Sequence, residues 1–491
     1  MSQTPEQGEV VVEVKNDVPE VVEPVPTEDT KESGSRARKS TESRQDDKKR
    51  SKKEAYQIQK KPKRKVAVML GYCGTGYNGM QVQNDPNVKT IEKDIYTAMV
   101  EAGAVSKENA TDLKKSAFQR AARTDKGVHA AGNVISLKMI IEDPDILEKI
   151  NSHLPDQIRV WGIQRTTKGF DCRKCCSSRI YEYLLPTFVL LPPKPSSVLS
   201  ELPELFEDDE EGVKWWEDVK AKILASGITQ EQLDSIGTIL DEDEASENSN
   251  QDTDLSYTQM IKKIKNIENA SRRQYRLLSH RLSHFRSVMS QYEGTHNFHN
   301  FTVGKPFKDT SANRYMIKTT VSEPFVIEGT EWVSIKIHGQ SFMLHQIRKM
   351  IAMAALVVRL SLPSKIINNF FKEDRINVPK APALGLLLEN PVYDGYNMKL
   401  GKTDYDAIDF TKFDKEMEEF KMKSKENTFY AFFGFIDAFK GNRNEDGELV
   451  QNGSSIFDFL FNYNEEIKEE PKEEPKEEPK EDTITETKSE A

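Results

Sequence analysis

The sequence has 491 residues and a formal net charge of −10, and hydrophobic residues make up 36% of it. This length allows two or three domains, whereas the low hydrophobic content excludes a chain that is ordered throughout. No apolar run approaches membrane-spanning length, and the four cysteines are too few and too clustered for a disulfide framework, so we expect a reducing intracellular compartment.

The acidic residues are concentrated in three segments. Residues 1–47, 201–255 and 465–491 carry net charges of −6, −15 and −7, so the remainder of the chain carries +18. A basic body of this kind is expected of a protein that neutralises phosphates. The alternative is an even spread of positive charge over a solvated surface, and composition alone does not decide between the two.

Residues 1–63 are predicted to be a disordered tail that ends in a basic run. Two clusters, KKRSKK at 48–53 and KKPKRK at 60–65, resemble a bipartite nuclear-import signal. We therefore expect a nuclear protein whose segment 48–65 binds an import receptor. An RNA-binding arm and a plain solvated charge run are the alternatives.

Residues 64–200 alternate between strand and helix patterns and form the first half of the predicted catalytic domain. Helices are expected from Thr90 and at about 143–153. Strands are expected at 66–72, 133–141, 159–165 and 179–186.

An acidic insertion or linker follows at 201–255, with a short helix where Trp215 and Trp216 lie.

Residues 256–460 form the second half, and 461–491 form an acidic low-complexity tail. The basic stretch 256–286 predicts one long helix with a face suited to phosphates, although a solvated amphipathic helix is the alternative. Strands are expected at 314–324 and 331–339, and a helix at 342–360. Mixed strands and helices without a regular βαβ repeat indicate an α+β fold.

Two motifs have alternatives that bear on cofactors. The segment 74–79 matches the G-x-G-x-x-G pattern of dinucleotide sites, but no helix pattern opens after its last glycine, which favours a glycine-rich turn. Cys172, Cys175 and Cys176 have half the spacing of a zinc site without a second pair of ligands, so small buried thiols are favoured over a structural zinc.

The segment that indicates chemistry is RAARTDKGVHA at 120–130, just before an expected strand. It places Asp125 among Arg120, Arg123 and Lys126. Cations around a loop carboxylate keep it ionised, which is the state that a nucleophilic carboxylate needs. Taken alone, such a loop is more commonly a salt-bridged turn.

The whole string resembles the R-T-D-x-G-V-H signature of the TruA-type pseudouridine synthases, most closely their eukaryotic nuclear branch, which modifies tRNA at several sites. Five more blocks resemble that family in the same order, and they are GYCGTGYNGMQ (71–81), SSRIYEYLLP (177–186), GTHNFHNFT (294–302), SFMLHQIRKM (341–350) and APALGLLL (381–388). The resemblance implies the pseudouridine synthase fold, with two sheet-plus-helix halves flanking a basic RNA-binding cleft.

The resemblance also implies roles for individual residues. Asp125 matches the nucleophile, Arg348 the basic residue that pairs with it, and Tyr181 the tyrosine that packs on the uracil and assists proton removal at C5. Arg123 matches the arginine that helps to flip the uridine out of its stack. His129 and His345 are expected to be structural, because uracil isomerisation does not require an imidazole. Further RNA contacts are expected from basic side chains, which are Arg120, Lys126, Arg272 and Arg273.

We therefore expect a cofactor-independent, monomeric isomerase with no membrane attachment. Its expected substrates are uridines in tRNA, including the anticodon arm, and other nuclear RNAs such as snRNA or mRNA. The alternatives are a catalytically idle tRNA-binding or tRNA-folding protein and a paralogue of narrow specificity.

Overall fold

The computed structural model describes residues 61–194, 210–234, 255–401, 403–423 and 432. The predictions for 1–60, which include the first basic cluster, and for 461–491 fall outside these residues. The described residues from Pro62 onwards belong to one compact unit. Within the described ranges, no helix combines the length and the apolar content needed to cross a membrane.

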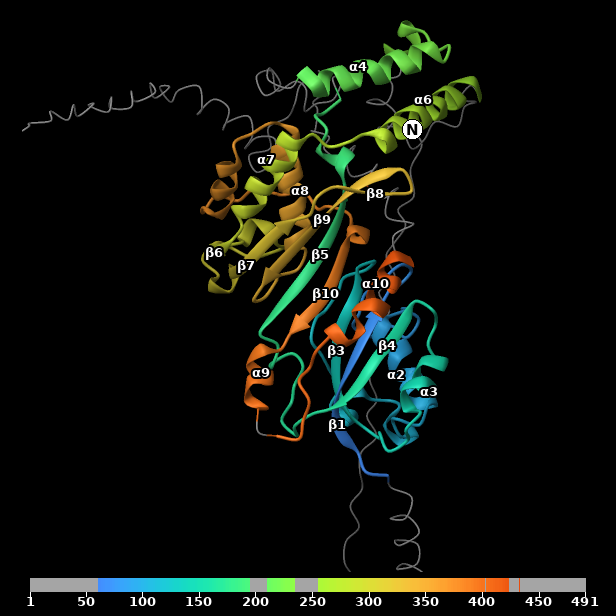
Figure 1. The fold of residues 1–491 in the computed structure, drawn as a ribbon, viewed down its shortest axis with the longest axis vertical. Coiled ribbons are helices and arrows are strands. Elements are labelled where there is room, and N and C mark those ends of the chain that lie inside the picture. The colour runs from blue at the N-terminus through green and yellow to red at the C-terminus, as the bar shows by residue number, and fades with distance from the viewer. Residues whose placement is uncertain (1–60, 195–209, 235–254, 402, 424–431, 433–491) are drawn as a thin grey trace, which may run out of the picture. The chain divides into compact units, whose positions relative to one another are not determined.

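Ten strands form one mixed sheet (Figure 1), in the order β4-β1-β3-β10-β5-β9-β7-β6, with β2 paired to β3 and β8 to β9. The strands are β1 (Arg64–Tyr72), β2 (Gln119–Arg120), β3 (His129–Met139), β4 (Ile158–Arg165), β5 (Ser178–Pro186), β6 (Gly294–Asn297), β7 (Asn313–Val321), β8 (Phe325–Ile327), β9 (Thr330–Gly339) and β10 (Leu386–Val392). The α+β prediction is confirmed, and the four strands expected in the first half appear as β1, β3, β4 and β5.

Strand β10 joins the two predicted halves. It comes from the second half of the chain, yet it lies between β3 and β5, with Leu387 beside His129 and Leu388 opposite Tyr181. The β3–β10 pairing is parallel, whereas the other strand pairings of the described chain are antiparallel. The halves therefore share one continuous sheet instead of holding a sheet each.

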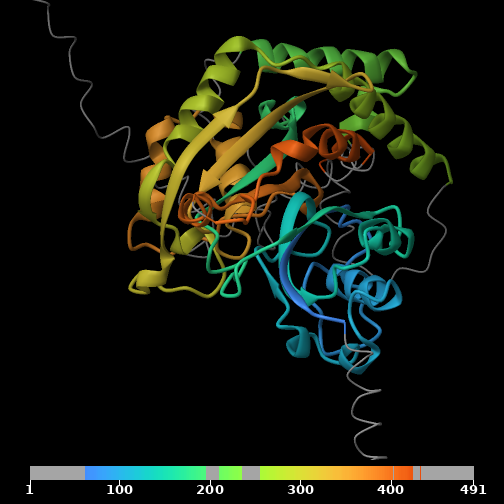
Figure 2. The same cartoon turned by 60° about the horizontal axis from the view of Figure 1, so that its bottom comes forward.

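Helices cover both faces of this sheet (Figures 1 and 2). The helices are α2 (Ile91–Glu101), α3 (Ile146–Ser152), α4 (Glu210–Ala225), α6 (Leu255–Gln274), α7 (Ser279–Ser290), α8 (Gln346–Arg359), α9 (Asp394–Lys399) and α10 (Asp414–Lys423). Because successive strand residues face opposite sides, Val68 of β1 packs in the core that holds α2, α7 and α8, whereas Met69 packs with residues from α9 and α10.

The sequence prediction was wrong about the basic stretch 256–286. It forms two helices, α6 and α7, separated at 275–278. In that gap the side chain of Tyr275 is buried and the backbone N–H of Leu277 donates to Glu331 Oε1 at 2.6 Å, so tertiary contacts break the helix. The acidic insertion contains the expected helix around Trp216, which is the longer α4 and packs against α6 through its own apolar cluster.

Candidate active site

A cavity of about 790 Å³ lies on the α8 side of the sheet. It is lined by residues 78–85, by 123–126 and by His345 and Arg348. The fold thus brings three predicted site residues from one loop, Arg123, Asp125 and Lys126, together with Arg348 from α8. His345, which the sequence reasoning assigned to structure, lines the same cavity.

Side chains from β1 and β3 hold the loop that contains Asp125 through hydrogen bonds. The hydroxyl groups of Thr124 and Tyr72 are 2.8 Å apart and share a buried hydrogen bond. Asn133 of β3 donates to Tyr72 Oη and to the carbonyl oxygen of Ala122, each at 3.2 Å. These buried bonds hold the residues that flank Asp125, so the carboxylate has a defined place at the cavity wall.

The glycine-rich segment 74–79 packs against this loop. A Cβ on Gly74 would lie 2.2 Å from the carbonyl oxygen of Val128, and one on Gly79 would lie 2.8 Å from that of Thr124. Gly79 also has φ +94°, which favours glycine. The glycines therefore permit a close approach of two backbones, a use that the motif pattern did not reveal.

The side chains of Asp125 and His345 are in direct contact. Nδ1 of His345 lies 3.2 Å from Oδ2 of Asp125, and the two side chains are 19% and 32% exposed. The N–H direction is not well aligned for a hydrogen bond, and Nδ1 has no other acceptor among the described residues. Burial lowers the pKa of His345, and the charges of Lys380 and Arg348 act in the same direction, whereas Asp125 opposes them.

Arg348 lies near Asp125 but makes no direct ion pair with it in the described residues, contrary to the prediction. Its Nε donates to the carbonyl oxygen of Ala381 at 2.6 Å, and Ala381 N donates back to Arg348 O at 3.1 Å. Burial lowers the pKa of Arg348, and the charges of Tyr183 and Asp125 oppose that shift. Arg348 is the one residue of α8 that is not buried, and its side chain lines the cavity.

Tyr181 lies on β5 and is 7% exposed, and it is not among the residues that line the cavity. Its ring packs edge-on against Phe342, with centroids 5.1 Å apart. Burial raises the pKa of Tyr181 to about 12, with Arg179 opposing and the nearby charge of Asp125 reinforcing the shift. No hydrogen bond from the Tyr181 hydroxyl to another described residue is present, so the hydroxyl remains available to a substrate.

The two arginines of the motif have different surroundings. Arg123 is exposed at the cavity. Arg120 instead forms an ion pair with the fully buried carboxylate of Glu92, whose other oxygen accepts from Val82 N at 2.9 Å. The guanidinium of Arg120 thus supports the wall segment 78–85 from inside, and the structure does not place it as an RNA contact.

Arg272 also differs from its predicted role. It is 6% exposed, interacts with Glu268 and Asn269 of α6, and lies over the ring of Trp216 from α4. Its guanidinium is part of the contact between α4 and α6. Arg273, its neighbour, is half-buried at the end of α6.

The cysteine cluster lies on the other face of the sheet. Cys172 is fully buried, and burial raises its pKa to about 12, whereas Cys175 and Cys176 are half-buried. Across the described part of the chain, no group of three or more His, Cys, Asp or Glu side chains is arranged to hold a metal ion.

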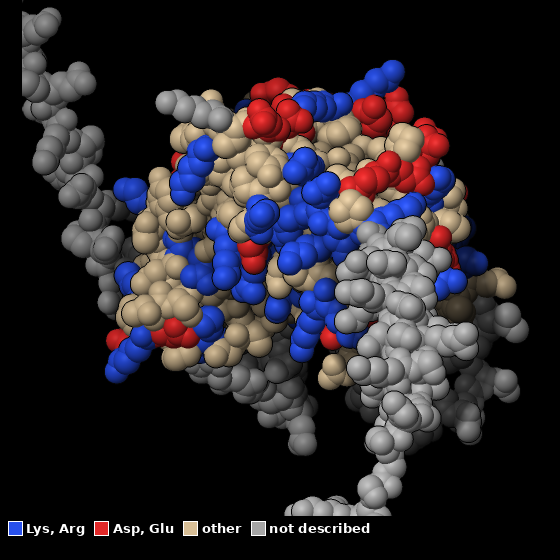
Figure 3. Space-filling model, turned by 90° about the horizontal axis from the view of Figure 1, so that it is seen from below, with Lys and Arg blue, Asp and Glu red and all other residues tan. Residues whose placement is uncertain are grey.

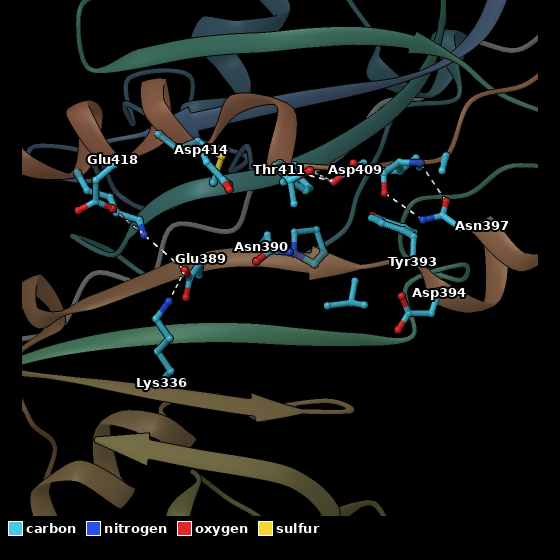
Figure 4. Close-up of a pocket in the computed structure, with 17 residues that line it drawn as sticks. Lys336, Glu389, Asn390, Tyr393, Asp394, Asn397, Asp409, Thr411, Asp414 and Glu418 are labelled. Atoms are coloured by element: carbon cyan, nitrogen blue, oxygen red, sulfur yellow. Dashed lines mark hydrogen bonds and ion pairs between the residues drawn. The ribbon is translucent and has the colours of Figure 1, made fainter. Parts of the chain in front are cut away.

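A second cavity, of about 740 Å³, lies against α9 and α10 (Figure 4). Glu389 of β10 pairs there with Lys336 at 2.7 Å. Lys421 of α10 contacts both Glu389 and Glu182, and Glu182 faces away from its strand neighbour Tyr181. This cavity is therefore on the opposite face of the sheet from Asp125.

Basic side chains gather on one face of the molecule. Figure 3 shows Lys and Arg across the middle of the face seen from below, with Asp and Glu mostly along its upper edge. Such a separation of charge within one face suits a polyanionic ligand.

Known proteins resemble this chain over most of its length. A family model described as tRNA pseudouridine synthase matches residues 288–394. The chain is 74% identical over 437 residues to tRNA pseudouridine synthase 1 of Candida albicans, covering 83% of this chain and 71% of that protein. It is 51% identical to tRNA pseudouridine synthase 1 of Saccharomyces cerevisiae, covering 81% of this chain and 77% of that one. It is also 42% identical to the tRNA pseudouridine(27/28) synthase of Saccharomyces cerevisiae, covering 70% of this chain and 87% of that one.

Proposed function

Because the chain belongs to the tRNA pseudouridine synthase family, we propose that it converts specific uridines of tRNA to pseudouridine with Asp125 as the nucleophile. The observation that carries this proposal is the cavity that Asp125 lines together with Arg123, His345 and Arg348. In the reaction the N1–C1′ bond breaks, the uracil turns, and C5 bonds to C1′. C5 loses its proton and N1 gains one, so the product is an isomer of uridine.

The surroundings of Asp125 support an ionised carboxylate that attacks and later departs. The cation of Arg348 interacts with the charge of Asp125 without forming a direct ion pair with it. Arg123 stands exposed beside the carboxylate, where it can take the place of the base that leaves the stack. Tyr181 offers a buried ring and an unpaired hydroxyl next to the position of the uracil.

Recognition of the RNA is proposed to rest on shape and on phosphate contacts. The net charge of +18 outside the three acidic segments and the gathering of Lys and Arg in Figure 3 support this. Binding should therefore weaken steeply as salt rises. We extend the proposal to other nuclear RNAs, such as snRNA or mRNA, whose folded regions present a similar arrangement of phosphates.

The proposed reaction requires no cofactor, since the carboxylate, the cations and the tyrosine supply the groups that it needs. We propose a monomeric enzyme that reaches the nucleus through the segment 48–65. Chelator treatment should leave the activity unchanged, and elemental analysis of protein purified without added zinc should find no stoichiometric zinc. Alanine substitution of the cluster at 48–53 in a fluorescent fusion should shift it from the nucleus to the cytoplasm.

The direct test uses tRNA transcripts labelled with tritium at C5 of uridine. Because C5 becomes bonded to C1′, each turnover releases one tritium to water. The proposal expects release with the wild-type chain, with sites then mapped on tRNA, snRNA and mRNA fragments. Tight tRNA binding without release on any RNA would favour a non-catalytic binder, and release from a single RNA would indicate a paralogue of narrow specificity.

A further inference from the structure

His345 has a backbone conformation that needs an explanation. It has φ +63° and ψ +1°, in the left-handed region that a residue with a Cβ adopts rarely, at the position just before α8. Strain of this kind persists where the surroundings hold it, and it concentrates at functional sites.

The surroundings hold the turn that contains His345 from both sides. Gln346, buried at the start of α8, accepts from Met343 N with its Oε1 at 2.9 Å, and its own N–H donates to Met343 O at 3.2 Å. The hydroxyl of Thr302 donates to Leu344 O at 3.0 Å. These bonds fix the residues on either side of His345, so the direction of its imidazole is set by the fold.

That direction brings the imidazole to the nucleophile. Nδ1 lies 3.2 Å from Oδ2 of Asp125, and no other described side chain forms an ion pair with that carboxylate. Three charged groups act on the ring, which are Asp125 in the loop, Arg348 on α8 and Lys380 before β10. The two cations and burial disfavour a second proton on the ring, which leaves a neutral imidazole, and a nearby carboxylate favours the tautomer with the proton on Nδ1.

We propose that His345 is the positioning residue for Asp125: when RNA is bound, its neutral imidazole turns to donate Nδ1–H to Oδ2 and thereby leaves Oδ1 to attack the uridine. The inference rests on the proposed function, because it assigns one more residue to the same site. A protonated ring would bind the carboxylate more strongly and make it a weaker nucleophile. The neutral ring orients the carboxylate while leaving most of its reactivity.

Three substitutions at His345 distinguish the effect of losing the N–H donor from the effect of changing the backbone conformation. Asparagine, aspartate and glycine all tolerate the left-handed region. His345→Asn keeps an N–H donor. His345→Asp has almost the same shape as His345→Asn but places an acceptor where the donor was. His345→Gly removes the side chain. We expect single-turnover rates on saturating tRNA about 3- to 10-fold below wild type for Asn, and about 10- to 100-fold or more below for Asp and Gly.

The Kd for tRNA should change little in all three variants, because the effect is on the reacting carboxylate. The acidic limb of the rate profile, followed from about pH 5 to pH 8, should belong to His345 and be lost in His345→Asn. Equal rates for all three variants and wild type would overturn the proposal. So would an equal loss in Asn and Asp, because the donor would then not matter. Should the glycine variant unfold, the Asn and Asp pair still decides.

A second measurement does not depend on activity. In protein labelled with ¹⁵N-histidine, His345→Asn identifies the His345 signals, which should report a proton on Nδ1 in the wild type. Asp125→Asn should lower the pKa of His345 further, because a carboxylate that opposes the lowering is lost. An Nε2-protonated ring, or a pKa of His345 that Asp125→Asn leaves unchanged, would overturn the inference even if no RNA were modified. A wild type without product but with these NMR signals would instead contradict the proposed function.

Discussion

Gly79 lies against the backbone of Thr124, the residue before Asp125. A Cβ at Gly79 would be 2.8 Å from Thr124 O and 3.4 Å from the carbonyl carbon of Asp125, and Met80 N donates to Thr124 O at 3.1 Å. The cavity wall and the nucleophile loop therefore pack directly against each other. A substitution in the wall should displace the carboxylate of Asp125.

Gly79→Ala should reduce the single-turnover rate strongly. The added methyl group pushes on the Asp125 loop, and a displacement of about 1 Å can cost about 100-fold in rate. The matched control is Gly76→Ala, because Gly76 has a similar φ of +80° but no atom within 4 Å of the added Cβ. Both variants should lose about 1–2 kcal/mol of unfolding free energy through φ alone. Comparable rates in the two variants would argue against a coupled wall and loop.

Arg120→Ala should destabilise the protein through Glu92. The carboxylate of Glu92 is fully buried, and removal of its cationic partner leaves a buried charge unpaired, at a cost of about 3–5 kcal/mol. Arg123→Ala, three positions on, removes an exposed cation and should leave the urea denaturation midpoint nearly unchanged while lowering the rate of the reaction. A stable Arg120→Ala variant with weak RNA binding would restore the role predicted from the sequence.

The stability deficit of Arg120→Ala should shrink as pH falls. Burial raises the pKa of Glu92, against the hydrogen bond from Val82 and the charge of Arg120. A carboxyl whose folded pKa is raised is most favourable to the fold when protonated, and its contribution is lost as pH rises through that pKa. Without Arg120 the pKa of Glu92 rises further, so urea denaturation of both proteins at about pH 5 and pH 8 should give the larger difference at pH 8. A deficit that does not depend on pH would contradict this account.

Tyr181→Phe should separate stability from chemistry. The hydroxyl makes no hydrogen bond to a described residue, so its removal should change the unfolding free energy by less than about 1 kcal/mol. Burial raises the pKa of Tyr181 to about 12, so at neutral pH the hydroxyl is protonated and can donate to the uracil. Loss of this hydrogen bond should slow the reaction by about 10- to 100-fold, measured by tritium release. A variant with the wild-type rate would leave Tyr181 with a packing role only.

Sequence patterns predicted the strands and helices whose formation depends mainly on residues close together in the chain. The expected strand at 66–72 and the helix from Thr90 appear as β1 and α2. Strand β10 was not expected, because Glu389, Asn390 and Pro391 interrupt its apolar pattern and its partners are far away in the chain. The break between α6 and α7 was missed for the same reason, since the contact of Leu277 with Glu331 is invisible to helical periodicity.

The site shows the same division. The motif string identified the loop that holds Asp125, and the fold brings Arg348 to the same cavity. The sequence could not show which group each arginine contacts. Arg120 forms an ion pair with Glu92 and Arg272 with Glu268, and Arg348 donates a hydrogen bond to the carbonyl oxygen of Ala381. His345 was taken as structural because the chemistry does not demand an imidazole. The expected helix at 342–360 contained His345, whereas α8 begins only at Gln346. The spacing of three residues between His345 and Arg348 was the signal in the sequence that could have identified it.

The central claim is that Asp125 is the nucleophile. The measurement that tests it most directly is the yield of pseudouridine in a uridine-labelled tRNA, determined by nucleoside analysis after single turnover with saturating wild-type or Asp125→Asn protein, with the Kd for the same tRNA measured in parallel. The account predicts pseudouridine with the wild type and none above background with Asp125→Asn, at a similar Kd. Equal yields from the two proteins would contradict it.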